Sequence, residues 1–353
     1  MTEPLTFIPT HDIPLVYHFS GGPLPKYGYR SLSEVAKRWS GPVVLLHDRD
    51  LAKPIANVQV DNFFSWYNPD PFASWAKNSE MQLDFRNGFW FHAIERFFVL
   101  DQWFRNSSYK HFLHCELDVA LMNSDRLITT LQKLKPGIYY PRASELNAGA
   151  NWLFSNSPAA LSALVAYLTE NSGRAFEMAL LAKFLDDFPQ ISAAAPSHYS
   201  FENPSPGFSF LEARRLREWG GLVDVHPIGT WILGHDPRNV VSGPVFNHFY
   251  YEGIGSPMVA SLRVLFLWKT RSLWIEDIDG VRWPLFALHV HSKRIEIGYS
   301  SLRLAVYVLL ARLPWRTVVI GQHWGKWGIG KIKKLVDKCY LGLKKLRPGR
   351  LDD

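Results

Sequence analysis

The chain has 353 residues, of which 47% are hydrophobic and 20% are charged, so it can bury a substantial core and wholesale disorder is not expected. Its two cysteines, Cys115 and Cys339, argue against a disulfide scaffold and fit a reducing compartment. The first residues have neither the basic nor the apolar region of a signal peptide, and we therefore expect a cytoplasmic protein.

The net charge of +7 is concentrated at the C-terminus. From Ser301 onward there are 12 Lys and Arg against 3 Asp and Glu, whereas the first 300 residues carry 27 basic and 29 acidic side chains. Within residues 330–346, apolar residues recur at helical spacing among lysines, a pattern typical of a basic amphipathic helix on an anionic membrane surface. We expect a catalytic domain over residues 1–298 and a basic helical region over 299–353. That region would contact the inner face of the cell membrane or pack on the domain, and no nucleic-acid partner is expected.

The beginning of the chain predicts an α/β sheet. Ile13–Phe19 and Pro42–Leu46 read as buried strands, and Ser31 and Glu34 have the spacing of a capping box that opens a short helix ending near Trp39. The order of strand, helix and strand favours parallel pairing. Ligands of such sheets bind beyond the carboxyl ends of the strands.

The next two segments contrast in composition. Asp61–Asn87 is rich in Asn, Asp, Pro and aromatic residues, and we interpret it as a long loop. Gly88–Asn106 is apolar on nearly every turn and predicts a largely buried helix. Glu95 and Arg96 within this helix require charged partners, because an unpaired buried charge is costly.

The stretch Tyr109–Asn123 carries the most informative acidic pair. Its apolar residues Phe112–Cys115 predict a buried strand, and Glu116 and Asp118 follow. If the chain stays extended, residues two apart point to the same side, so the two carboxylates would converge at the strand end. Such a pair is a plausible oxygen-ligand site for Mg²⁺ or Mn²⁺, with substrate phosphates completing the shell. The alternative is an ordinary strand end with its acids in water.

Helices and short strands are expected through the rest of the chain. In residues 144–156, small residues flank Asn147 and Asn151, which would let the backbone approach a ligand closely. Residues 224–239 have the glycines and the Asp-Pro pair of a turn-rich active-site loop. Helices are expected at Ser124–Leu134, at Phe176–Phe188, and from Pro158, which follows Ser157 as its N-cap. A strand is expected at Gly137–Tyr140. Leu273–Asp279 and Trp283–Val290 are expected to form a hairpin around Gly280.

Four segments resemble those of metal-dependent, nucleotide-sugar glycosyltransferases of the GT-A fold, which has a Rossmann-like α/β sheet. Phe112–Leu121 resembles the strand that ends in the D-x-D motif, with Glu116 in place of the first Asp. Asn147-Ala148-Gly149 resembles an N-[AS]-G turn. Ile228–Asn239 is similar to a G-x-x-x-L-G-x-D-P-R-N segment, and Leu288–Lys293 to an L-H-[IV]-H-S-K ending, of poorly characterised bacterial glycosyltransferases. The resemblance spans residues 10–295.

The resemblance implies a mixed α/β sheet flanked by helices and a divalent ion, Mn²⁺ or Mg²⁺, bridging the diphosphate of a nucleotide-sugar donor. Asp118 is implied as a direct ligand, Glu116 as a direct or water-mediated one, and His289 or His291 as a further one. Contacts to the donor are expected from Asn147, Gly149, Asn151, Asp236, Arg238 and Lys293. The acceptor would be a glycan or a lipid-linked molecule, activated by Glu177 or Asp187 as base.

Other protein classes fit part of these observations. A glycoside hydrolase also uses two carboxylates, but the late H-x-H-S-K segment would then have no role. A zinc hydrolase would use the histidines, yet they lack a recognisable H-E-x-x-H partner. A nucleotidyltransferase would need a glycine-rich loop after the first strand, and Gly21-Gly22-Pro23 matches such a loop poorly. A non-catalytic carbohydrate-binding, membrane-associated protein would explain the tryptophans and the basic tail, but not the acids. An H-x-H pair is also often structural, and acids on helices are usually solvated.

Overall fold

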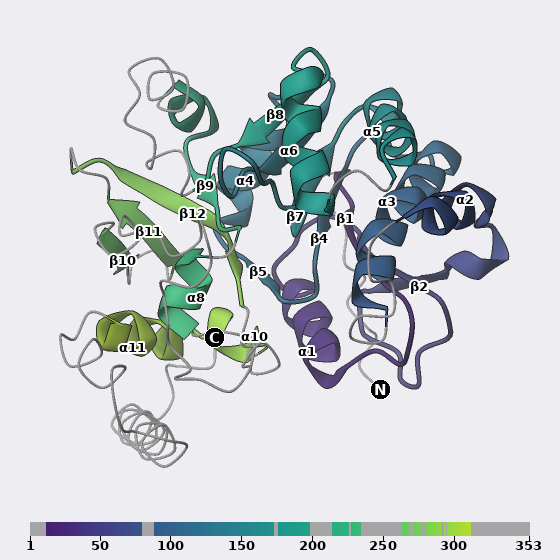
Figure 1. Cartoon of the computed structure of the whole chain (residues 1–353). Coiled ribbons are helices and arrows are strands. Elements are labelled where there is room, and N and C mark those ends of the chain that lie inside the picture. Colours follow the sequence, from purple (N-terminus) through teal and green to yellow (C-terminus); the bar gives the residue numbers. More distant parts are fainter. Residues whose placement is uncertain are drawn as a thin grey trace, which may run out of the picture.

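The computed structural model describes residues 12–79, 88–172, 176–197, 214–225, 227–233, 263–267, 272–276, 280–290, 293 and 295–311. Seven strands of these residues form one mixed sheet (Figure 1). In sheet order they are β3 Gln59–Asn62, β2 Val43–His47, β1 Leu15–Phe19, β4 Phe112–Cys115, β7 Trp152–Ser155, β6 Ile138–Pro141 and β8 Ser192–Ala195. Strand β7 is antiparallel to both of its neighbours, and the remaining pairs are parallel.

Alternating side chains along the strands pack on the two faces of this sheet. On β1, Val16 belongs to the core beneath one set of helices, whereas Leu15 and Tyr17 belong to the core on the other face. The first set comprises α2 Asp70–Asn78, α3 Phe89–Asn106, α5 Pro158–Glu170 and α6 Glu177–Asp187. The opposite face is covered by α1 Lys26–Val35 and α4 Ser124–Leu131. The predicted mixed α/β sheet flanked by helices is thereby confirmed.

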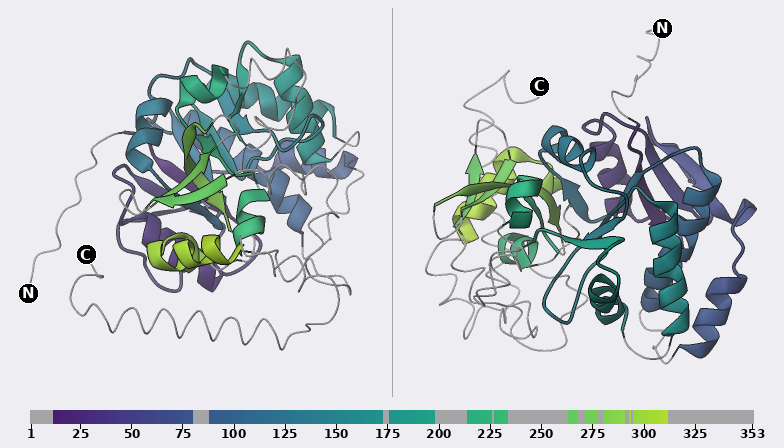
Figure 2. Two further views of the ribbon diagram at one scale, coloured as in Figure 1. Left: turned by 90° about the vertical axis from the view of Figure 1, so that its left-hand side faces the viewer. Right: turned by 90° about the horizontal axis from the view of Figure 1, so that it is seen from above.

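A second sheet of the described residues lies to one side of the first (Figures 1 and 2). Its strands are β10 Arg263–Leu267, β11 Ser272–Glu276, β12 Arg282–His289 and β5 Val119–Leu121, with β9 Leu222–Val223 pairing beside β12. The helices α8 Pro227–Leu233, α10 Ile295–Gly298 and α11 Ser301–Ala311 pack around it. The chain passes from the first sheet to the second between β4 and β5, within the three residues 116–118.

Several predicted elements are present where the apolar pattern was long or the cap was specific. Strands β1 and β2, helix α3 and the β11–β12 hairpin are all found. Helix α5 begins at Pro158, and the Ser157 side chain accepts a hydrogen bond from the amide of Ala160 at 3.2 Å, as expected of an N-cap.

Two predictions in the first hundred residues were wrong. Helix α1 begins at Lys26 rather than at Ser31, because Ser31, Leu32 and Val35 form one buried face of a helix that starts a turn earlier. The supposed loop from Asp61 contains the end of β3, a 3-10 turn at Phe63–Ser65 and helix α2. Residues 80–87 of that segment lie outside the described residues.

Three further corrections concern the second half of the first sheet and its surroundings. The stretch from Tyr109 is not one extended strand, since β4 and β5 belong to different sheets and a turn separates them. Strand β7 occupies residues for which no strand was predicted, because short buried strands carry little sequence signal. Residues 227–233 of the expected loop at 224–239 form helix α8, and 234–239 lie outside the described residues.

The described part of the C-terminal region, helix α11, packs on α8, α10 and β10. The proposed basic amphipathic segment at 330–346 lies outside the described residues. Among those that are described, no helix has both the length and the hydropathy needed to span a bilayer.

A half-buried histidine on β1, His18, predicts how stability depends on pH. Burial lowers the pKa of His18 to about 3, and its Nε2 has no hydrogen-bond partner within the described part of the chain. The unfolded chain binds this proton near pH 6.5, so folding loses stability as pH falls from about 6.5 to about 3, by up to about 1.4 kcal/mol per pH unit.

We expect His18→Phe, which keeps a ring against Phe63, to lessen this dependence. Urea unfolding measured at several pH values between 4 and 7 gives the slope for both proteins. Equal slopes would show that His18 makes no contribution.

Candidate metal centre

The main chain fixes Glu116 and Asp118 from opposite sides. The amide of Val119 donates to the carbonyl of Glu116 at 3.0 Å and closes a turn. The amide of Glu116 donates to the carbonyl of Asn151 at 2.9 Å, whereas the carbonyl of Asp118 accepts from Val290 at 2.7 Å. One acid is therefore anchored beside the first sheet and the other beside the second.

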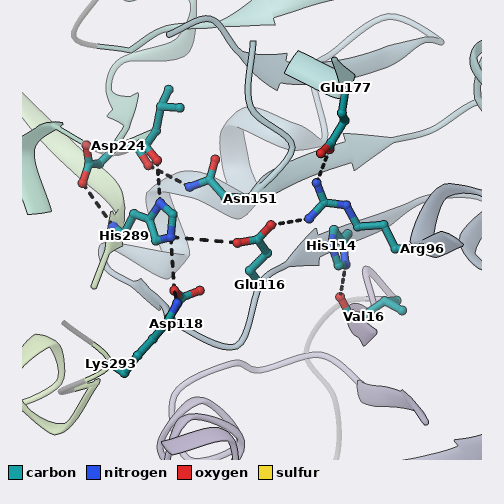
Figure 3. A network of polar contacts seen from close by, with 11 residues as sticks. Val16, Arg96, His114, Glu116, Asp118, Asn151, Glu177, Asp224, His289 and Lys293 are labelled. Carbon is teal, nitrogen blue, oxygen red and sulfur yellow. Dashed lines mark hydrogen bonds and ion pairs between the residues drawn. The ribbon is translucent and has the colours of Figure 1, made fainter. Parts of the chain in front are cut away.

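The two carboxylates meet a histidine from β12. One oxygen each of Glu116 and Asp118 and one ring nitrogen of His289 lie within 4.8 Å of one another. The Nε2 atom of His289 is 3.2 Å from Oδ2 of Asp118 and 3.9 Å from Oε2 of Glu116 (Figure 3). Ligand atoms at such spacing can bind one ion together, given metal–ligand distances of about 2.0–2.6 Å.

His289 is oriented by its other ring nitrogen. Nδ1 lies 2.6 Å from the carbonyl oxygen of Val225, which can only accept, so Nδ1 carries hydrogen and Nε2 faces the acids. Burial opposes protonation of this ring, but Asp118 and Glu116 outweigh it and raise the pKa of His289 to about 9. The ring is cationic at neutral pH until an ion displaces the proton on Nε2.

Asp118 is only 3% exposed and remains ionised. Its burial alone would raise its pKa, but Lys293 and His289 hold the pKa well below the usual range. The ammonium of Lys293 contacts Oδ2 of Asp118 directly (Figure 3). It also lies 5.7 Å from the ring centre of Tyr27. Two cationic groups thus balance one buried carboxylate.

The donor set fits a divalent cation. Carboxylate oxygens suit Mg²⁺ and Mn²⁺ alike, and an imidazole nitrogen favours the transition metal. The negative charge of the buried Asp118 is balanced by Lys293 and His289 in this structure, and a metal ion that took their place could balance it instead. Glu116, Asp118 and His289 are the residues of the described chain that would hold such an ion.

A buried arginine holds Glu116 from the other side. The guanidinium of Arg96, on α3, forms ion pairs with Glu116 and with Glu177 at the start of α6 (Figure 3). Burial raises the pKa of Glu177, and Arg96 partly offsets this. We predicted from the sequence that a buried Arg96 needs a charged partner, and Glu116 and Glu177 are its partners.

Asp224 is a site residue that sequence inspection did not single out. It is fully buried, and its carboxylate accepts from the amides of Ile228, Gly229 and His289, at 3.1, 2.7 and 3.2 Å. Burial raises its pKa to about 6, against the lowering effect of His289 and these amides. It joins the start of α8 to the end of β12 and so positions His289. The available signal was an acid shortly before Pro227, since a carboxylate near the start of a helix can accept from its first amides.

Gly229 allows α8 to approach β12 closely. A Cβ atom there would lie 1.8 Å from the carbonyl oxygen of His289, which is main chain and cannot simply rotate away. We expect Gly229→Ala to destabilise the fold by about 1–3 kcal/mol despite the better helix propensity of alanine, and to weaken Mn²⁺ binding by shifting His289.

The matched control is Gly22→Ala, where an added Cβ meets no atom within 4 Å. Urea unfolding and Mn²⁺ titration of both variants test this, with a change within about 0.5 kcal/mol expected for the control. Equal stability of the two variants would contradict the close approach.

The other residues that were predicted to bind the donor, activate the acceptor or bind the metal are found in different places. Asn151 is buried beside the cluster, donates from Nδ2 to the carbonyl of Asp224 at 3.0 Å, and leaves Oδ1 without a hydrogen-bond partner in the described residues. Gly149 lies next to it, whereas Asn147 donates to Ser144 in its own turn. Asp187 is at the far end of α6 from Glu177, paired with Lys183. His291, Asp236 and Arg238 lie outside the described residues.

No family model matches this chain, and no curated protein does. Several solved structures align with part of this chain. One is the galactosyltransferase LgtC in complex with donor and acceptor sugar analogs, which aligns at 11% identity over 56% of this chain and 82% of that chain, with a TM-score of 0.36. Mouse xyloside xylosyltransferase 1 aligns at 12% identity over 52% and 85% of the two chains, with a TM-score of 0.35. Core-mannan synthase A from Aspergillus fumigatus, in its Mn/GDP form, aligns at 9% over 51% and 72%, with a TM-score of 0.33. The side chains of the site, rather than these likenesses, carry the assignment of function.

Proposed function

We propose that this chain is a divalent-metal-dependent glycosyltransferase of the hexosyltransferase type. It would transfer a sugar from a nucleoside-diphosphate-sugar to a glycan or lipid-linked acceptor. The observation that carries the proposal is the convergence of Glu116, Asp118 and His289 at the carboxyl end of β4, in a mixed α/β sheet. The resemblance of the segments around these residues to glycosyltransferase motifs supports it.

The bound ion, Mn²⁺ in preference to Mg²⁺, would act as a Lewis acid that neutralises the departing diphosphate. Asp118 supplies a fully buried charge for it, and His289 presents Nε2 because Val225 fixes the ring. Arg96 prevents Glu116 from turning away. Lys293, which pairs with Asp118 in this structure, would be available as a cation for the diphosphate once an ion took its place. Glu177 and Asp187 remain candidates for the acceptor base.

The arrangement favours a cation site over a glycoside hydrolase. A hydrolase needs one carboxylic acid that keeps its proton near neutral pH, and such an acid has a raised pKa. The pKa of Asp118 is instead lowered, by Lys293 and His289, and Glu116 is ion-paired to Arg96. Asp118 is therefore not suited to donate a proton to a leaving group.

The test is incubation with Mn²⁺ and a panel of UDP-, GDP-, ADP- and dTDP-linked sugars, followed by chromatography for the released nucleoside diphosphate. We expect release from at least one donor, and loss of that release on addition of EDTA with recovery on excess Mn²⁺. Release that persists in EDTA after extensive dialysis would contradict the metal-dependent proposal, and hydrolysis of aryl glycosides without any nucleotide-sugar would favour the hydrolase.

The division of the chain stays a proposal of the same kind. Residues 1–298 would form the catalytic domain, and 299–353 a basic region for an anionic membrane surface, as would suit polysaccharide biosynthesis at the inner face of a membrane. Helix α11 supports a catalytic domain that extends somewhat further, since it packs on α8 and β10.

A further inference from the structure

Three aromatic rings gather at the adjoining starts of two helices. Phe89 and Trp90 are the first residues of α3, and Phe176 immediately precedes α6. The ring centres of Phe89 and Trp90 are 4.8 Å apart, and those of Trp90 and Phe176 are 6.2 Å apart. Phe89 is 47% exposed and Phe176 is 64% exposed. We call these three residues the aromatic platform.

The platform's exposure is unusual for this molecule. Within the described residues, the exposed large hydrophobic side chains are Phe64, Phe89, Leu146, Phe176 and Val281. Two of them belong to the platform, and a third, Leu146, is in the loop whose Ala148 amide donates to the carbonyl of Met178 on α6 at 2.9 Å. Most of the exposed large apolar side chains of the described chain are therefore concentrated around the start of α6, and such concentrations mark binding sites.

A short series of contacts connects the platform to the metal centre. Phe176 is followed by Glu177, whose carboxylate is paired with Arg96, and Arg96 is paired with Glu116. Along α3, Trp90 precedes Arg96 by six residues, which is about 9 Å of helix. Because Arg96 is buried and bound at both sides, the distance between the rings and the metal ligands is held by the two helices.

We infer that the aromatic platform binds a sugar ring of the acceptor, a neutral glycan, beside the metal centre. A pyranose has apolar C–H faces, which release water when they lie on an aromatic ring, and hydroxyl groups at its edge, which stay hydrated. Flat, half-exposed rings beside a polar centre suit such a molecule, whereas a protein partner would require a larger continuous apolar surface. The inference rests on the proposed glycosyl transfer and adds the class of the acceptor and where it binds.

The experiment compares the double variant Phe89→Ala/Phe176→Ala with Phe64→Ala, which removes an equally exposed phenylalanine, 64%, far from α6. Binding of maltohexaose, cellohexaose, laminarihexaose, mannohexaose and chitohexaose to the full-length protein with Mn²⁺ is measured by calorimetry. At least one should bind to the wild type, with Kd raised by roughly tenfold or more in the double variant and unchanged in the control. Binding of none of them, or equal binding by the double variant, would overturn the inference.

Two parallel measurements separate this result from other causes. Metal-dependent nucleotide release from the donor without acceptor should be the same in the double variant as in the wild type. Loss of oligosaccharide binding with intact release supports the platform, and absence of release from the wild type would instead refute the proposed function. Sedimentation velocity measures the oligomeric state of both proteins. A wild-type dimer that becomes monomeric in the double variant would identify the platform as a protein interface and overturn the inference.

Discussion

Asp118→Asn is expected to abolish Mn²⁺ binding and to lower transfer by about 100-fold or more, while the fold survives. Asparagine keeps the shape of the side chain but removes the buried charge that attracts a hard cation. Stability should be retained, because the same substitution frees Lys293, which is partly exposed and can turn to solvent, and lets His289 become neutral. Electron paramagnetic resonance of free Mn²⁺, circular dichroism and nucleotide release provide the three measurements.

Asp50→Asn is the matched control, since Asp50 is an exposed acid beyond the carboxyl end of β2. It should leave both metal binding and transfer at wild-type values. Glu116→Gln should weaken Mn²⁺ binding less than Asp118→Asn, because the Glu116 side chain is more exposed. Near-normal metal-dependent transfer by Asp118→Asn would refute the central assignment, and these acids would then be an ordinary turn between two sheets.

Arg96→Met is expected to have the largest effect on stability, about 3–5 kcal/mol. The guanidinium is buried between Glu116 and Glu177, and its removal leaves the carboxylate of Glu177 buried without its cation. The control is Arg214→Met, since Arg214 and its partner Glu218 are both exposed, at 65% and 55%, and such a pair should contribute no more than about 1 kcal/mol. Urea unfolding with a constant m-value gives both numbers.

A second substitution tests whether the cost arises from the unpaired acid. In Arg96→Met/Glu177→Met both charged partners are replaced by apolar side chains, so the double variant should be more stable than the sum of the two single changes predicts, by about 0.5–3 kcal/mol. Strictly additive effects would mean that Arg96 stabilises the fold by packing alone.

The sequence revealed those elements whose apolar residues were numerous and regularly spaced. The 18-residue helix α3 and the strands β1 and β2 were all predictable on this ground. Strand β8, Ser192–Ala195, was not, because its SAAA sequence has no β-branched or aromatic residue and owes its conformation to pairing with β6. The passage of the chain from the first sheet to the second after Cys115 could not be predicted either, since it depends on strands that come much later in the chain.

For the site too, local sequence patterns could be predicted and long-range contacts could not. Glu116 and Asp118 were recognisable because they are only two residues apart in the sequence, and His289 because it ends an apolar strand. The partners that hold them were not, because Glu177 is 81 residues from Arg96, and Asp224 is 65 residues from the His289 amide it binds. Contacts of that separation are set by the packing of helices on sheets, which no local pattern contains.

The three-residue passage between β4 and β5 gives the bound ion a mechanical role as well. Glu116 is anchored to the first sheet, whereas Asp118 and His289 belong to the second, so an ion bound by all three is a cross-link between two β-sheets. Its binding free energy then adds to the free energy that holds the sheets together, because unfolding either sheet destroys the site. Melting followed by calorimetry should accordingly become more nearly all-or-none as Mn²⁺ is added, because a bound ion would couple the unfolding of the two sheets.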